Sequence, residues 1–140
     1  MHERHSHAEA TSLLLLVCFC VAAFAQTPTD ATRRTPLLGT WSGAATRSDG
    51  VSIKTTVEFN FNGSFAGSAE VDGQPFWTYE GTWTLTGNDL TWTYVKSSRP
   101  IPNEARVDTD ELIALDGNTL TLRSKRTGRV HNFNRARKEK

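Results

Sequence analysis

Apolar and polar residues alternate with a period of two along most of the chain from residue 38 onward. The alternation is clearest in residues 51–61, where Val51, Ile53, Val57, Phe59 and Phe61 face one side and polar residues the other. This pattern is typical of a β-strand with one buried face and one solvated face. Turn residues recur roughly every ten residues, which favours an all-β sandwich or barrel.

The pattern predicts eight strands joined mostly by short hairpins. The expected strands cover residues 38–46, 51–61, 64–71, 77–86, 90–94, 105–115, 120–122 and 130–137. Asn62 and Gly63 form a dipeptide typical of a type I′ hairpin turn. Residues 97–104 contain two prolines and are expected to form the one long loop. The register of the sixth strand stays open, because Leu112, Ile113 and Leu115 cannot all share one face.

An eight-stranded meander leaves two exposed edges unless it closes on itself. Closure removes those edges, so we expect an antiparallel up-and-down β-barrel rather than a sandwich. Because successive strands alternate in direction, Trp41 at the start of the first strand and Arg135 late in the eighth must lie at the same end. The tight turns also fall at that end. The loop of residues 97–104 and the turn of residues 72–76 should rim the opposite end, which we call the mouth.

The N-terminal region is expected to be a targeting segment. Residues 13–24 form an unbroken apolar run, and Ala23 and Ala25 supply the small residues that precede a signal-peptidase site. We therefore expect a signal peptide at 1–25, a disordered polar linker at 26–36, a barrel at 37–137 and a basic tail at 138–140. The protein would be exported, periplasmic or secreted, with no membrane span after cleavage; a retained anchor is the alternative.

Composition narrows the possible chemistry. The chain has 140 residues and a formal net charge of +1, enough for one domain and with no bulk charge for nucleic acid. Both cysteines, Cys18 and Cys20, lie in the expected signal peptide. The remaining chain therefore offers no disulfide or thiol nucleophile, and no metal site, cofactor or enzyme activity is expected.

Charged residues cluster in the last three strands. Asp108, Asp110 and Glu111 are read as a solvated strand face. A basic group in the last two strands could steer an anionic ligand or rest on anionic lipid, or simply protect a sheet edge. That group includes Arg123, Lys125, Arg126 and Arg129.

Inward-facing aromatic residues are the candidate ligand-binding set. Trp77 and Tyr94 should lie near the mouth, and each ring carries a polar atom that needs a partner. His131 shares its face with Phe133 and is expected to contact ligand rather than act as a catalytic base. The alternative is that these rings fill a small barrel. The predicted ligand-binding residues are Phe59, Trp77, Tyr79, Trp92, Tyr94 and His131.

Several of these motifs resemble bacterial exported lipocalin-like domains of the calycin superfamily. They are Gly39-Thr40-Trp41, Gly81-Thr82-Trp83, residues 90–94, residues 116–122 and Phe133-Asn134-Arg135. The resemblance spans residues 37–137. It implies that Trp41 plugs the closed end, that Arg135 lies across it, and that a small hydrophobic ligand is bound without covalent chemistry. An avidin-like binding barrel, or a protein-interaction barrel acting through its outer face or basic last strands, is the alternative.

Overall fold

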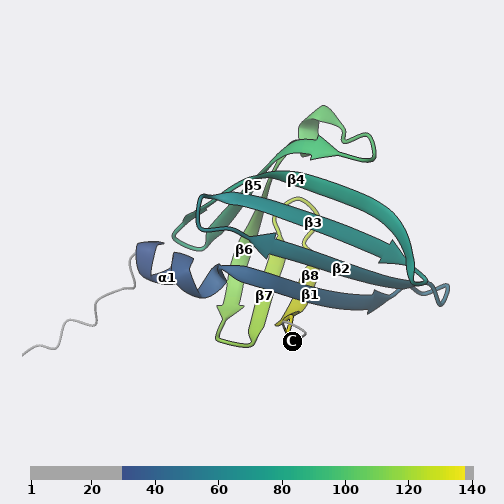
Figure 1. The fold of residues 1–140 in the computed structure, drawn as a ribbon, viewed down its shortest axis with the longest axis horizontal. Helices are drawn as coiled ribbons and strands as arrows, with labels where there is room; N and C mark the ends of the chain where they lie inside the picture. Colours follow the sequence, from purple (N-terminus) through teal and green to yellow (C-terminus); the bar gives the residue numbers. More distant parts are fainter. Residues whose placement is uncertain (1–29, 138–140) are drawn as a thin grey trace, which may run out of the picture.

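Eight strands of alternating pattern pair in sequence order and close into one antiparallel barrel (Figure 1). The structure is a computed structural model and describes residues 30–137; the predicted signal peptide, residues 26–29 and the tail at 138–140 lie outside that range. Closure confirms the predicted barrel and excludes the sandwich. The strands are β1 Gly39–Thr46, β2 Ser52–Phe59, β3 Ser64–Val71, β4 Gln74–Thr86, β5 Asp89–Ser97, β6 Val107–Leu115, β7 Thr119–Ser124 and β8 Val130–Arg135.

The turn between β2 and β3 differs from the predicted type I′ turn. Gly63 N–H donates to the Asn60 carbonyl, and Gly63 has φ of 84°, whereas Asn62 does not have positive φ. The turn is therefore built around Phe61 and Asn62, with Gly63 supplying the left-handed residue. Phe61 leaves the strand and is 85% exposed, so its predicted inward position was wrong. Asp72 and Gly73, with φ of 49° and 76°, have the two positive φ values of a type I′ turn.

A short helix precedes the barrel where a disordered linker was predicted. Helix α1, Asp30–Leu37, lies against the closed end, so the linker prediction is corrected for residues 30–36 (Figure 1). Arg33 donates to the Gly87 carbonyl, and the Arg34 guanidinium lies 4.3 Å from the Trp83 ring centroid. These tertiary contacts, rather than helix propensity, hold the segment. No helix within residues 30–137 is long and apolar enough to span a membrane.

A β-bulge in β6 explains why the register of this strand was ambiguous in the sequence. Leu112 pairs with Leu122, but the next pair is Ala114 with Thr121, so Ile113 is the extra residue. Ile113 is 42% exposed, and Leu112 and Leu115 both pack on the core despite their odd spacing. The long loop after β5 contains a 3₁₀ helix, Asn103–Ala105.

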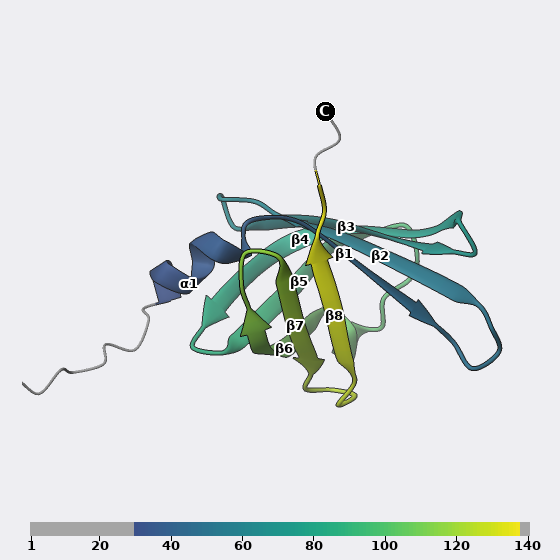
Figure 2. The same cartoon turned by 90° about the horizontal axis from the view of Figure 1, so that it is seen from below.

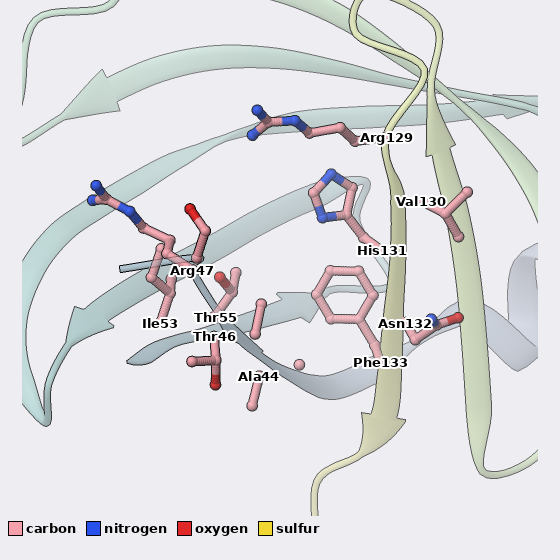
Figure 3. Close-up of a pocket in the computed structure, with 13 residues that line it drawn as sticks. Ala44, Thr46, Arg47, Ile53, Thr55, Arg129, Val130, His131, Asn132 and Phe133 are labelled. Carbon is pink, nitrogen blue, oxygen red and sulfur yellow. The ribbon is translucent and has the colours of Figure 1, made fainter. Parts of the chain in front are cut away.

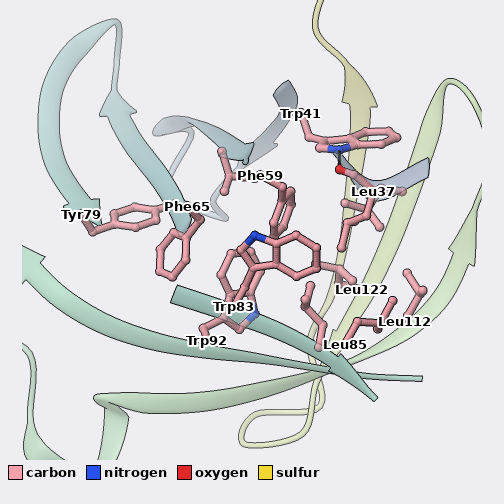
Figure 4. Packing of buried hydrophobic residues seen from close by; sticks show 13 residues of the cluster. Leu37, Trp41, Phe59, Phe65, Tyr79, Trp83, Leu85, Trp92, Leu112 and Leu122 are labelled. Atoms are coloured by element: carbon pink, nitrogen blue, oxygen red, sulfur yellow. Dashed lines mark hydrogen bonds between the residues drawn. The ribbon is translucent and has the colours of Figure 1, made fainter. Parts of the chain in front are cut away.

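The closed half of the barrel is filled by aromatic and leucine side chains (Figure 4). Phe59 packs edge-on against Trp83, with ring centroids 5.3 Å apart, and Phe65 packs edge-on against Trp92 at 5.0 Å. Trp41 is fully buried beneath Arg135, whose guanidinium carbon lies 4.2 Å from the ring centroid. This half therefore serves as the hydrophobic core.

Arg135 ties three segments together at the closed end. Its guanidinium donates to the carbonyls of Pro36 at 2.7 Å, Leu38 at 2.8 Å and Gly117 at 2.7 Å. Trp41 Nε1 donates to the Leu37 carbonyl at 2.8 Å. One buried ring and one guanidinium thus join α1, β1 and the β6–β7 turn, so the closed end acts as a single packed unit.

The pairing of β1 with β8, which closes the barrel and which we call the seam, is confined to the region near the closed end. The two strands pair at Trp41 with Arg135 and at Ser42 with Asn134, and no further pair follows. Figure 2 shows β1 and β2 diverging from β8 beyond this point. The barrel therefore flares toward the mouth, which leaves room for the candidate site.

Candidate functional site

A cavity of about 350 Å³ occupies the mouth half of the barrel. We call it the upper cavity. Its volume falls at the small end of the range for pockets that bury small molecules. Its apolar wall is formed by Val57, Trp77, Tyr79, Trp92, Tyr94, Leu122 and Phe133. Its polar wall is formed by Thr55, Asp108, Asp110, Ser124, Arg126, Thr127, Arg129 and His131.

Five of the six predicted ligand-binding residues line the upper cavity. Trp77 and Tyr79 are in contact, with ring centroids 4.3 Å apart, and Tyr94 lies 5.7 Å from Tyr79. Trp92 forms the floor, and His131 lies on the polar wall. Phe59 is the exception: it is 1% exposed, packs among the closed-half rings and does not line the cavity. Phe59 lies at the end of β2, paired with Gly39 near the closed end, and is therefore a core residue.

Hydrogen bonds fix two of the indole rings. Trp77 Nε1 donates to Ser97 Oγ at 2.7 Å, and that hydroxyl donates to the Arg99 carbonyl at 2.6 Å in the long loop. Trp92 Nε1 donates to Asp110 Oδ2 at 2.9 Å. The polar atom of each tryptophan is therefore satisfied, and the ring orientation is set before any ligand arrives.

The acidic residues of β6 are not a solvated face, which corrects the sequence interpretation. Asp108 and Asp110 share the inward face with Leu112 and line the upper cavity, while Glu111 points outward to Arg123. The signal was present in the sequence: once Leu112 is placed inside, the two-residue period carries Asp110 and Asp108 inward with it. The inward position of the two aspartates was not predicted, because the sequence left the register of this strand open.

The two inward carboxylates have different partners. Asp108 accepts from Arg126 Nη2 at 3.1 Å and Nε at 3.3 Å, forming an ion pair. Asp110 takes part in none of the ion pairs among the described residues. The upper cavity therefore contains one neutralised carboxylate, Asp108, and one, Asp110, whose only side-chain hydrogen bond within residues 30–137 comes from Trp92.

Burial controls the protonation of the cavity groups. It raises the pKa of Asp110 above its usual value, against the lowering effects of the Trp92 hydrogen bond and the His131 and Arg126 charges. Burial also raises the pKa of Tyr79 to about 12 and the pKa of Tyr94 further still. Both phenols are neutral at physiological pH, and neither hydroxyl makes a hydrogen bond with the described residues.

Replacing Asp110 with asparagine is expected to stabilise the protein at neutral pH. Because the folded-state pKa of Asp110 is raised, its protonated form favours folding below the unfolded pKa, and this contribution is lost as pH rises through the folded pKa. Asparagine keeps an acceptor for Trp92 and removes the buried charge. Thermal unfolding from pH 7 downward should show the gain of D110N shrinking and vanishing below about pH 4.

Asp116 provides a control, because its contribution to stability should change with pH in the opposite direction to that of Asp110. Hydrogen bonds from the Asn118 N–H and from Thr119 hold the pKa of this exposed carboxyl below its usual value. Its stabilising contribution is therefore present above the unfolded pKa and lost as pH falls. A stability difference between wild type and D110N that stays constant across the same pH range would contradict the assignment for Asp110.

A second hollow of about 770 Å³, the lateral groove, lies between β1–β2 and β8 where the seam is open (Figure 3). It shares Thr55, Arg129, His131 and Phe133 with the upper cavity, so the two spaces meet at this wall. Figure 3 shows His131, from β8, and Arg129, from the turn before β8, reaching toward the β1–β2 side, where Arg47 lies. The upper cavity is therefore reached from the side of the barrel as well as from its mouth.

Three residues of the predicted basic group are paired with acidic residues. Arg123 contacts Glu111 at 3.2 Å, Lys125 contacts Asp89 at 2.7 Å and Arg126 contacts Asp108 at 3.1 Å. Arg129 takes part in no ion pair among residues 30–137 and lines both hollows. Within that range no three His, Cys, Asp or Glu side chains gather as a metal site.

The chain is similar to known proteins in sequence and in structure. A lipocalin-like protein from Bacteroides uniformis is similar in structure, with a TM-score of 0.54, 20% identity, and coverage of 72% of this chain and 99% of that chain. A de novo designed fluorescence-activating β-barrel gives a TM-score of 0.45 at 18% identity, covering 77% of this chain and 99% of that one. No curated protein matches the sequence significantly. The lipocalin-like domain model matches residues 37–122, more than half of the chain, and the protein therefore belongs to the lipocalin-like domain family.

Proposed function

We propose that the protein is an exported, non-catalytic binding protein that takes a small, largely hydrophobic molecule into the upper cavity. The observation that carries the proposal is the contrast between the two halves of the barrel. The closed half is filled by core side chains, whereas the mouth half holds a cavity of about 350 Å³ walled by five aromatic residues. Family membership adds support, since barrels of this size can hold one small ligand.

The affinity would come mainly from apolar burial against prearranged rings. Burial of apolar surface contributes roughly 25 cal/mol per Å². The Tyr79 ring occupies the space over Gly67, where an added Cβ would lie 2.2 Å from a ring carbon. Trp77 and Trp92 are fixed by hydrogen bonds. Such preorganisation reduces the entropy lost on binding.

Binding without covalent chemistry fits the surroundings of His131. Its side chain is exposed and makes no hydrogen bond with the described residues, so no orienting group or nucleophile is held at bonding distance. The interaction-barrel alternative has less support, because Arg123, Lys125 and Arg126 of the basic group are already paired with carboxylates. We propose export because residues 13–24 form an apolar run typical of a signal peptide. Mass spectrometry of the protein purified from its own source should then show a mature chain that begins at Gln26.

Native mass spectrometry of protein purified from its own source tests the binding proposal. We expect a retained small molecule that is released on unfolding. In parallel, 1-naphthylmethanol, a neutral apolar probe, should shift the indole NMR signals of Trp77 and Trp92 and leave those of Trp41 and Trp83 unchanged. Shifts at neither cavity tryptophan would contradict binding in the upper cavity.

Trp77→Ala is expected to weaken binding of 1-naphthylmethanol by about tenfold or more, because it removes one aromatic wall of the upper cavity. Its cost in stability should be clearly smaller than that of Trp41→Ala, since Trp77 is only partly buried. Calorimetric titration measures the affinity. Phe76→Ala is the matched control: Phe76 precedes Trp77 but is 47% exposed, and it should bind as wild type does. Equal affinities for the two variants would contradict the assignment of Trp77.

A further inference from the structure

We propose that the upper cavity selects a ligand carrying a protonated amine on an aromatic or apolar body, with the ammonium group held at the Asp110 carboxylate. This inference rests on the proposed binding function and names the chemical class of its ligand. It follows from which charged groups in the cavity already have partners and which do not.

Asp110 is the cavity carboxylate that forms no ion pair with residues 30–137. Asp108 is neutralised by Arg126, and Glu111, on the outer face, by Arg123. Asp110 accepts one side-chain hydrogen bond, from Trp92 Nε1 to Oδ2. A half-buried carboxylate without a cationic partner is costly to hold, and an ammonium group arriving with the ligand would neutralise it through a charge-assisted hydrogen bond.

The rings around this carboxylate favour a cation as well. Trp77 stacks near Tyr94, with centroids 6.1 Å apart and an interplanar angle of 27°, and Tyr79 contacts both. Trp92 forms the floor and carries the hydrogen bond to Asp110. Aromatic faces attract organic cations, most strongly where water is excluded. Ring faces and carboxylate therefore favour the same kind of group in the same space.

The remaining charges define the orientation of the ligand. Arg129 and His131 lie at the wall shared with the lateral groove, whereas Asp110 and Asp108 lie on β6 inside the barrel. An anionic head group placed deep in the cavity would meet the Asp110 carboxylate, which has no ion-pair partner among the described residues. The amine is therefore expected to point inward, with the rest of the ligand extending toward the groove.

A series of matched probes tests this inference. The probes are 1-naphthylmethylamine, 1-naphthylmethanol and 1-naphthoate, which share one apolar body and differ in charge. Calorimetric titration at neutral pH should show the amine binding about tenfold or more tighter than the alcohol, and the carboxylate weakest. D110N should remove the preference for the amine, so that the amine and the alcohol bind to this variant with similar affinity. Glu111→Gln, on the outer face of the same strand, should behave as wild type.

The outcomes separate this inference from the proposed function. Binding of the alcohol as tightly as the amine, tighter binding of the naphthoate, or a preference for the amine that persists in D110N would overturn the amine assignment while leaving a binding cavity. Absence of binding by all three probes, with unmoved indole signals from Trp77 and Trp92, would overturn both. Because D110N is expected to fold at least as stably as wild type, loss of its amine preference cannot be attributed to unfolding.

Discussion

Trp41→Ala is expected to lower the free energy of unfolding by about 3–5 kcal/mol, the range typical of deleting a buried tryptophan. The ring is fully buried, and its loss leaves a cavity beneath Arg135 and removes the donor to the Leu37 carbonyl. The free energy of unfolding of small domains is only about 5–15 kcal/mol, so the variant should be marginally stable. Urea unfolding followed by circular dichroism measures the change.

Two further variants make this prediction specific. Phe61→Ala also deletes an aromatic ring, but from an 85% exposed position, and should change stability by no more than about 0.5 kcal/mol. Trp41→Phe keeps most of the buried ring and loses the Nε1 hydrogen bond, so it should fall between the two and remain measurable if alanine prevents folding. A loss below about 1 kcal/mol for Trp41→Ala would contradict the role of this ring as the plug of the closed end.

Gly81→Ala is expected to cost about 2 kcal/mol or more, because the new methyl group has no space. An added Cβ would lie 1.9 Å from the Thr93 carbonyl oxygen and 2.9 Å from the Phe65 ring. The first obstacle is backbone of the neighbouring strand, so β4 and β5 must separate locally. Tyr94 is the register partner of Gly81, and the same variant should therefore also weaken ligand binding in the upper cavity.

Gly117→Ala is the control for this substitution. Gly117 lies in the β6–β7 turn without positive φ, and no atom lies within 4 Å of the Cβ that alanine would add there. Chemical denaturation of the two alanine variants should separate them clearly. Equal stabilities would show that β4 and β5 tolerate the methyl group and would contradict the close approach of these strands.

Asp110 is expected to affect both the stability of the fold and the proposed ligand binding. Its inward carboxylate is expected to destabilise the fold at neutral pH, yet it is the group assigned to hold the ligand's amine. Binding sites often retain groups that reduce stability, because the ligand supplies the missing partner. D110N should therefore gain stability and lose amine selectivity together.

The barrel itself could be predicted from local pattern, and so could the grouping of its ends. Alternation with a period of two marks strands, and the parity of eight antiparallel strands places Trp41 and Arg135 together; the structure has them in contact. The same counting put Trp77 and Tyr94 near the mouth, and both line the upper cavity. These conclusions need only the side-chain alternation of a strand and closure of the sheet.

The errors arose where a position depends on more than its neighbours in sequence. Phe61 follows the alternation of β2 but lies in the turn, because the chain bends one residue earlier than the Asn62-Gly63 dipeptide indicates. Residues 30–36 lack a strong helix pattern and form α1 through contacts of Arg33 and Arg34 with distant turns. Such contacts have no signature in a single sequence.

The sequence by itself determined the strand order, the closed barrel and the aromatic residues that line its mouth. Only the tertiary structure decided that the closed half is solid, that the β1–β8 seam opens sideways, and that Asp108 and Asp110 face inward. For Asp108 and Asp110 the physical reason is the bulge at Ile113. A single extra residue reverses which side of a strand its neighbours face, and its position is set by packing of Leu112 and Leu115 against the rest of the barrel.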